Sequence, residues 1–260
     1  MAEKNKLPLA IILITTIVTG CGPRRISLPS GPGSPASDFA TVLSAARAAC
    51  TGVRAWQAEL ALSGRAAGQR IRGRVHAGLL PGALRLEGVA PFGSPVFILV
   101  ADGSRGTLLL LRDRRVLKDA APEEILNALV GIRLGPDDLR AMLSGCVRAA
   151  LEPVSGRAYG ADWMAVDLAA GGTAYLQRRE GAWRIVAGRY GGLEIDYTAF
   201  QGDRPSQVVL RGTDLNLNVA LNQVEVNGNL PRDQLVAVKI PPGLSPLTLE
   251  ELRRAGPIGE

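Results

Sequence analysis

Residues 215–226 read LNLNVALNQVEV, the clearest alternation of apolar and polar side chains in the chain. A period of two residues is typical of a β-strand that buries one face and exposes the other. Val224 and Val226 continue the apolar pattern in the opposite parity, which predicts a β-bulge or turn near Asn222 and Gln223. The segment therefore predicts a long strand on a sheet with one dry face.

The same period recurs in both directions from this strand. Trp56 and Leu60 alternate with polar or small residues, and Ile71 and Val75 alternate with arginines. Residues 96–102 and 107–111 are apolar on both faces, so we expect both faces to be covered. The pattern predicts about eleven strands: 56–63, 70–79, 83–90, 96–102, 107–111, 163–168, 173–177, 182–187, 193–200, 207–211 and 215–226.

Segments with helix start and stop signals lie between the predicted strands at a few places. Apolar residues recur at helical spacing from Ser37 or Asp38 to Gly52, and segments 122–131 and 136–145 each begin with proline and end in glycine. Their paired acids, at 123–124 and 137–138, suit helix N-termini better than catalysis, because adjacent helical residues point about 100° apart. A capping box, with Thr248 and Glu251, predicts a short helix over 248–254.

These elements show no βαβ rhythm and no repeat. They predict one curved antiparallel sheet with three helices on one face, a mainly β fold. If the helices close over the concave side, the space beneath them holds either packed apolar side chains or an apolar ligand.

The first twenty residues differ from the rest. Two lysines precede the apolar run Leu7–Val18, whose helix of about 18 Å is shorter than a bilayer core of about 30 Å, so we interpret residues 1–20 as a signal peptide. The motif Val18-Thr-Gly-Cys21 resembles the lipobox of bacterial lipoproteins, which implies lipidation of Cys21 and a permanent membrane anchor. With Gly22 in place of an aspartate, the resemblance implies the outer membrane, facing the periplasm. We expect a Pro/Gly-rich tether at 21–36, a folded domain at 37–228 and a Pro-rich tail at 229–260.

The composition excludes several classes of metal site and catalytic site. The chain has 47% hydrophobic residues, a formal charge of +6 and one histidine, His76, which alternates with Arg70, Arg72 and Arg74 on a strand face that we expect to be solvated. One histidine cannot build a polyhistidine metal site, and no nucleophile elbow or phosphate-binding loop is present. The charge is too diffuse to indicate nucleic-acid binding. We therefore expect no enzyme activity, no metal and no cofactor.

Cys50 and Cys146 remain after the lipidation cysteine. Both lie on apolar helical stripes and point between the sheet and the helices. In an oxidising compartment they could form one disulfide, whereas two separate buried thiols fit the sequence equally well.

At four places the chain resembles the LolB and LolA family of lipoprotein sorting. They are the strand and loop RLEGVAPFGS at 85–94, the paired helices within 129–145, the Gly181-Ala-Trp183 strand, and the strand 215–226. The resemblance implies an open half-barrel under helices, with an apolar cavity for acyl chains of lipoproteins received from a periplasmic LolA-like carrier. It implies delivery to the inner leaflet of the outer membrane by a monomer, without chemistry. The same fold serving as a lipid- or glycolipid-binding envelope protein or scaffold, without insertion, is the alternative.

Two sets of residues follow from these arguments. Pro91, Phe92 and Gly93 form a stiff turn whose aromatic ring either folds back or is exposed; the resemblance implies an exposed, membrane-delivering residue. Strand parity predicts the residues on the concave side, which either line an acyl cavity or pack a filled core: Trp56, Leu60, Ile71, Val75, Leu84, Leu86, Trp183, Ile185, Leu193, Ile195, Leu217 and Val219.

Overall fold

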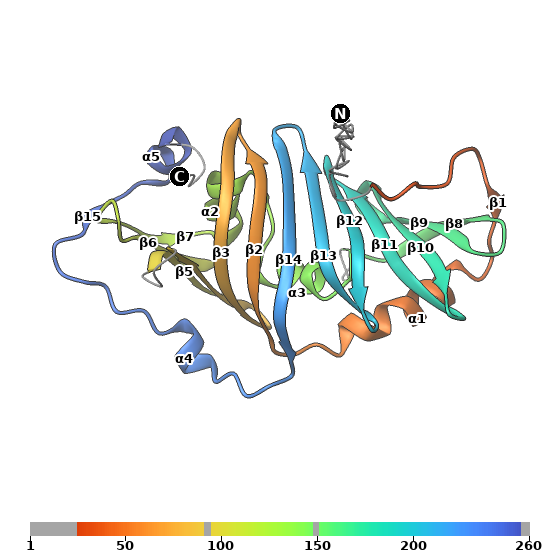
Figure 1. Cartoon of the computed structure of the whole chain (residues 1–260), viewed down its shortest axis with the longest axis horizontal. Coiled ribbons are helices and arrows are strands. Elements are labelled where there is room, and N and C mark those ends of the chain that lie inside the picture. Colours follow the sequence, from red (N-terminus) through yellow and green to blue (C-terminus); the bar gives the residue numbers. More distant parts are fainter. Residues whose placement is uncertain (1–24, 91–94, 148–150, 256–260) are drawn as a thin grey trace, which may run out of the picture.

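A computed structural model describes residues 25–90, 95–147 and 151–255 (Figure 1). These residues form one large, open, curved sheet of fifteen strands with five α-helices. One half of the sheet contains β8 (Pro153–Tyr159), β9 (Trp163–Leu168), β10 (Gly172–Arg179), β11 (Ala182–Tyr190), β12 (Leu193–Gln201), β13 (Arg204–Gly212) and β14 (Leu215–Val226). The other half contains β2 (Trp56–Ala66), β3 (Gln69–Leu80), β4 (Ala83–Val89), β5 (Pro95–Asp102), β6 (Arg105–Leu110) and β7 (Arg115–Ala120). The two-residue strands β1 (Ser34–Pro35) and β15 (Ser245–Pro246) form its edges.

The sheet consists of two antiparallel meanders that meet at its centre. Strands β8 to β14 follow one another in space as in sequence, as do β2 to β7, and β14 pairs with β2 to join the two halves. Among the described strands, only the short edge strand β15 pairs in parallel, with β7. The expected bulge in β14 is confirmed, because the register with β2 shifts between Asn222 and Glu225 and Gln223 has a φ of 52°.

This strand order places the helices. Strand β7 lies near one edge of the sheet and β8 near the other, so the chain between them must cross the molecule. That crossing carries α2 (Pro122–Val130) and α3 (Pro136–Leu143), which lie behind the central strands in Figure 1. Helix α1 (Phe39–Thr51) runs along the other half, against β8, β9 and β11. The helices thus cover the concave face because the connections must pass over it.

The described sheet has four strands that the sequence pattern did not predict. They are β7 and β8 and the two-residue edge strands β1 and β15. Strands β7 and β8 lie at the ends of the sheet, where exposed faces tolerate charged and small residues, so RVLKDA and PVSGRAY carry little alternation. The strand count of eleven is therefore too low, although the mainly β class and the single open sheet are confirmed.

The helix count was also too low. The four predicted helices correspond to α1, α2, α3 and α5, and the structure adds α4 and one 3₁₀ turn, η1 (Ala169–Gly171). Helix α4 (Arg232–Val236) was missed because it is five residues long and buries only Leu235. It packs on β4 and β5 from the side opposite to α2 and α3, which provides the second cover expected over residues 96–102.

The two ends of the expected domain differ from the sequence-based boundaries. Ser34 and Pro35, at the end of the expected tether, pair with Ala158 and Arg157 of β8. The expected tail packs onto the domain through β15 and through α5 (Leu249–Ala255), whose Leu252 is 1% exposed. Unpaired sheet edges and the exposed side of α2 supply the partners for both segments.

Candidate functional site

An apolar cavity of about 130 Å³ lies between the centre of the concave face and the helices α2 and α3. Every residue that lines it is apolar, so the cavity offers burial but no described hydrogen-bonding side chain. The sheet contributes Leu60, Leu62, Ile71, Val75, Leu86, Phe97, Leu210, Leu217 and Val219. The crossing segment contributes Leu126, Leu129, Val130, Ile132, Leu139, Met142 and Leu143.

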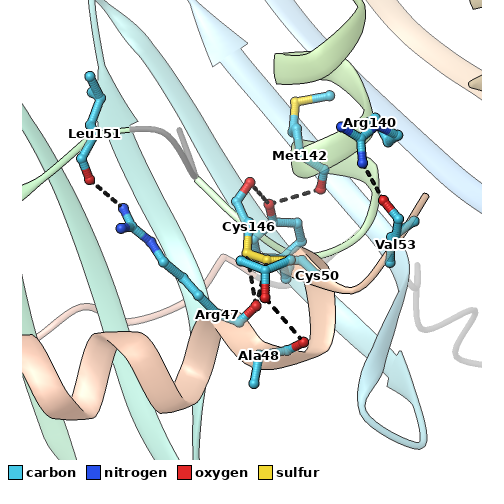
Figure 2. Close-up of a disulfide and its surroundings, with 10 residues drawn as sticks. Arg47, Ala48, Cys50, Val53, Arg140, Met142, Cys146 and Leu151 are labelled. Atoms are coloured by element: carbon cyan, nitrogen blue, oxygen red, sulfur yellow. Dashed lines mark hydrogen bonds between the residues drawn. A yellow bond between two sulfur atoms is a disulfide. The ribbon is translucent and has the colours of Figure 1, made fainter. Parts of the chain in front are cut away.

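Helix α3 is fastened through its C-terminal half (Figure 2). A disulfide joins Cys146, just after α3, to Cys50 in the last turn of α1, with 6.0 Å between the two Cα atoms. The buried Tyr197 hydroxyl of β12 lies 2.9 Å from the Met142 carbonyl oxygen and 3.2 Å from that of Cys146. Burial raises the pKa of the Tyr197 phenol, which therefore stays a hydrogen-bond donor. At the same helix, Arg140 donates to the Val53 carbonyl.

Helix α1 is tied to the same region by a partly buried arginine. Arg47 donates to the Leu151 carbonyl oxygen at 2.9 Å, beyond α3 in the chain. Burial lowers the pKa of Arg47, and the nearby Glu152 opposes that shift. These contacts and the disulfide make α1 and the end of α3 one unit.

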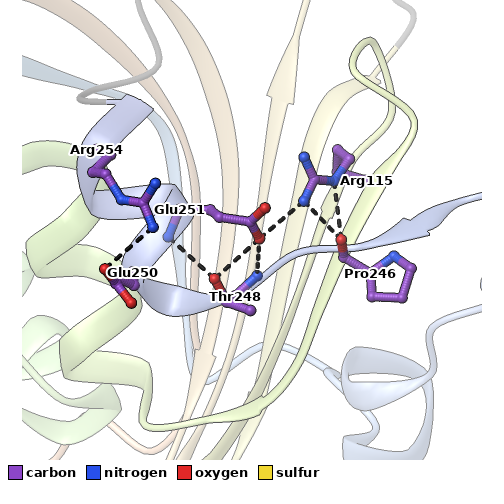
Figure 3. A network of polar contacts seen from close by, with 6 residues as sticks. All are labelled: Arg115, Pro246, Thr248, Glu250, Glu251 and Arg254. Atoms are coloured by element: carbon purple, nitrogen blue, oxygen red, sulfur yellow. Dashed lines mark hydrogen bonds and ion pairs between the residues drawn. The ribbon is translucent and has the colours of Figure 1, made fainter.

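Helix α2 is held by a different part of the chain. Its Glu124 accepts from Arg253 of α5 at 2.5 Å and pairs with Arg133 at 2.7 Å. The first turn of α5 is itself closed by a capping box between Thr248 and Glu251, as predicted, and Arg115 of β7 binds both Glu251 and the Pro246 carbonyl (Figure 3). The two helices over the cavity therefore have separate supports.

An open groove of about 650 Å³ adjoins the cavity. The two spaces share Leu62, Ile71, Val75 and Phe97 as lining residues. The register of β3 with β4 ends at Arg74 and Val89, so residues 69–73 of β3 extend beyond β4. The groove lies at this step in the sheet, where residues of both faces meet.

A glycine makes room for the ring that separates the two spaces. A Cβ atom on Gly88 would lie 2.2 Å from Cε1 of Phe97, a separation that real structures do not show. Phe97 is half-buried and lines both the cavity and the groove. We conclude that Gly88 allows the Phe97 ring to lie across the opening.

Comparison with solved structures gives the fold. A LolA superfamily protein from Nitrosomonas europaea superposes with a TM-score of 0.53 at 8% identity, covering 76% of this chain and 96% of that one. A domain assigned to outer membrane lipoprotein sorting, from Vibrio parahaemolyticus, gives a TM-score of 0.50 at 8% identity, covering 75% of this chain and 94% of that one. No protein-family profile matches the sequence. No curated protein sequence matches it either.

This is a LolA-like fold. At such low identity the likeness establishes the architecture, and it does not separate a receptor of the LolB type from other proteins with this fold. In both comparisons the match covers almost the whole of the solved chain and about three quarters of this one.

The LolA-like sheet divides the twelve residues expected to line the cavity into two groups. Six line it: Leu60, Ile71, Val75, Leu86, Leu217 and Val219. Six do not: Trp56, Leu84, Trp183, Ile185, Leu193 and Ile195. The expectation that all twelve line the cavity is therefore corrected for these six residues.

Packing explains where the second group lies. Trp56 and Leu84 are fully buried and belong to one cross-strand row with Leu79, at the end of the sheet away from the groove. Trp183 and Ile185 line a separate groove of about 180 Å³ beside α1, while Ile195 is buried in the core and Leu193 is half-buried. Helix α1 and the disulfide cover the concave face on the side of β8, β9 and β11. Strand parity alone therefore could not separate residues that line the cavity from residues that pack in the core.

Several lining residues were missed at the sequence level. Strand parity already placed Leu62 on the apolar face, and the stripes Leu126–Leu129–Val130 and Leu139–Met142–Leu143 have helical spacing. Both stripes were assigned to covering helices without being listed as lining. No alternation marks Phe97 or Leu210, because each lies within a run of consecutive apolar residues, at 96–101 and 208–210.

The remaining predicted residues are not among the described residues that line the cavity. His76 is exposed, and its register partners on the two neighbouring strands are Glu59 and Glu87. Among the described residues no three His, Cys, Asp or Glu side chains converge as a metal site would require. The predicted lipidation site Cys21 and the turn Pro91, Phe92 and Gly93 lie outside the described residues. No helix in the described part of the chain has the length and apolarity to cross a membrane.

Proposed function

We propose that this protein binds the acyl chains of a membrane amphiphile in the cavity beneath α2 and α3. The observation that carries the proposal is the lining. All sixteen described lining residues are apolar, and their side chains leave a cavity of about 130 Å³ between them. Each methylene transferred from water to such a lining contributes about 0.8 kcal/mol. An acyl chain has the matching chemistry and needs no polar partner.

Binding of an acyl chain requires the cavity to become larger. A cavity of about 130 Å³ is smaller than the roughly 300–1,000 Å³ typical of ligand sites. The adjoining groove and an outward movement of α2 supply the rest, because α2 is held by side-chain ion pairs and not by a covalent link. We infer that the protein takes up its ligand through the groove.

The place of action follows from the predicted lipobox at Cys21. An acylated N-terminus would hold the domain on the outer membrane, facing the periplasm. From the resemblance to the LolB and LolA family, we propose that the amphiphile is the acylated N-terminus of a lipoprotein. In this proposal a LolA-like carrier delivers the lipoprotein and the anchored protein places it in the outer membrane. Holding a lipid without insertion is the second candidate, and the basic groove described below favours it.

A cavity-filling variant tests acyl binding. Val130 of α2 is half-buried and lines the cavity, whereas Val224 of β14 is equally half-buried but does not line it. In Val130→Trp we expect at least a tenfold loss of affinity for a diacylglycerol with a pyrene-labelled chain, measured by fluorescence. Val224→Trp should bind like the wild type. Equal binding by all three proteins would remove the cavity from the proposal.

A transfer assay separates the two candidates. Under the receptor proposal the mature protein takes a triacylated lipoprotein from its carrier and passes it to a bilayer, and Phe92→Glu blocks only the second step. Depleting the protein in its native cell should leave lipoproteins in the periplasm or inner membrane. Lipid bound without any uptake of lipoprotein would favour the second candidate.

A further inference from the structure

The groove that opens into the cavity has a polar side of one charge. Its described lining includes Arg72, Arg74 and Arg112, together with the hydroxyl of Ser63 and the amide of Asn218. None of the described lining residues carries a carboxylate. Arginine, hydroxyl and amide groups together are donors that suit an oxyanion.

The arginines of the groove carry more positive charge than the described carboxylates neutralise. Arg72 and Arg74 are two residues apart on β3, so their side chains leave the same face about 7 Å from each other. Arg72 and Arg112 are exposed, and among the described residues neither has an ion-pair partner. Arg74 has one, Glu59, with 3.7 Å between Nη1 and the carboxylate oxygen. The three guanidinium groups around the groove therefore share one ion-paired carboxylate among the described residues.

The apolar side of the same groove leads into the cavity. Ile71 and Val75 alternate with the two arginines on β3 and line both spaces, as does Phe97. A molecule whose chains lie against Phe97 would reach the guanidinium groups of Arg72 and Arg74, which leave the opposite face of β3 from Ile71 and Val75, around the step at which β3 extends beyond β4. The site has the polarity of an amphiphile with an anionic head.

We propose that the ligand of this site is an anionic phospholipid, whose phosphate is bound by Arg72, Arg74 and Arg112 while its chains enter the cavity. This inference rests on the proposed acyl-binding function and names the class of lipid. Arginine can bind a phosphate through two parallel hydrogen bonds, an interaction that a neutral glyceride does not offer. The site thus discriminates between lipids by head group as well as by chain.

The test compares two pyrene-labelled lipids with the same chains, phosphatidylglycerol and diacylglycerol, on the full mature protein. We expect the wild type to bind phosphatidylglycerol at least tenfold more tightly. The triple variant Arg72→Gln/Arg74→Gln/Arg112→Gln should bind both lipids equally, with the affinity for diacylglycerol unchanged. A matched control is Arg54→Gln/Arg105→Gln/Arg204→Gln, which removes the same charge from three exposed arginines outside the groove and should behave like the wild type.

Each other result overturns the inference in a recognisable way. Equal affinities in the wild type, or a triple variant that still prefers phosphatidylglycerol, would remove the head-group site and leave acyl binding intact. Failure of the wild type to bind either lipid would remove the proposed function itself. If glycerol 3-phosphate alone binds as tightly as the lipid, the groove is a site for a soluble phosphate. If the triple variant loses only adhesion to phosphatidylglycerol vesicles, the arginines serve membrane contact.

Discussion

Gly88 and Gly73 show how single residues on neighbouring strands set the geometry of the opening. The Phe97 ring occupies the position of a Cβ atom on Gly88, whereas a Cβ atom on Gly73 would have no neighbour within 4 Å. Both glycines belong to the groove lining, and neither has a positive φ. The identity of the residue at position 88 therefore matters through packing and not through backbone conformation.

We predict that Gly88→Ala lowers the free energy of unfolding by about 1–3 kcal/mol, because Phe97 must leave its position. Gly73→Ala should change it by less than about 0.5 kcal/mol in the destabilising direction. Urea denaturation of the two variants measures the difference. Adding Phe97→Leu to Gly88→Ala should restore part of the loss, and a double variant as unstable as the single one would contradict the assignment of Phe97.

Glu251 controls the docking of the short helix α5 through its protonation state. Hydrogen bonds from the Thr248 backbone and from Arg115 lower its pKa from 4.5 to about 2. Because the folded pKa lies below the unfolded one, the stabilisation is complete above about pH 4.5 and disappears as the pH falls through about 2. We predict that α5 remains docked at pH 4 in the wild type but is loosened in Glu251→Gln at every pH. Hydrogen exchange of residues 249–255 reports docking, and equal protection of the two proteins at pH 7 would refute the prediction.

At the scale of elements, the two helices over the cavity should respond to different changes. Helix α2 depends on Arg253 and Leu252 of α5, whereas α3 depends on the disulfide and Tyr197. Deleting residues 244–260 should raise hydrogen exchange in 122–130 and speed the uptake of labelled diacylglycerol, with little change in 136–143. Reduction of the disulfide should have the converse effect. Loosening of both helices by either change would show that they move as one lid.

Sequence periodicity predicted the elements that bury one face or one stripe of side chains. It did not predict the elements that bury few side chains. The alternation of 215–226 and the Pro and Gly punctuation of α2 and α3 were sufficient because one face or stripe of each contacts the core. Strands β7 and β8 and helix α4 bury too few side chains to leave a period. Leu86 and Ile195 are both buried and both belong to the face that strand parity assigned to the concave side, yet only Leu86 lines the cavity. The difference depends on where α1 and α3 lie, which is information from the tertiary fold.

At the scale of the whole molecule, the disulfide closes a loop that contains half of the sheet. Cys50 and Cys146 are 96 residues apart, and the enclosed segment includes β2 to β7 together with α2 and α3. The sequence left open whether these cysteines pair, and the structure pairs them between the end of α1 and the end of α3. Because α1 packs on β8 and β11, the bond connects the two halves of the sheet independently of the β14–β2 pairing.

Loop-closure estimates for about 100 residues give roughly 4–5 kcal/mol of stabilisation from the unfolded chain. We predict that Cys50→Ala/Cys146→Ala lowers the free energy of unfolding by several kcal/mol and leaves the urea midpoint insensitive to reductant. In the wild type the midpoint should fall on reduction to near that of the variant. The measurement is urea denaturation with and without reductant, accompanied by mass analysis after alkylation. Two alkylated thiols in the unreduced mature protein would contradict the bond. A bond without any effect on the midpoint would mean that the two halves of the sheet are held together by β14 and β2 alone.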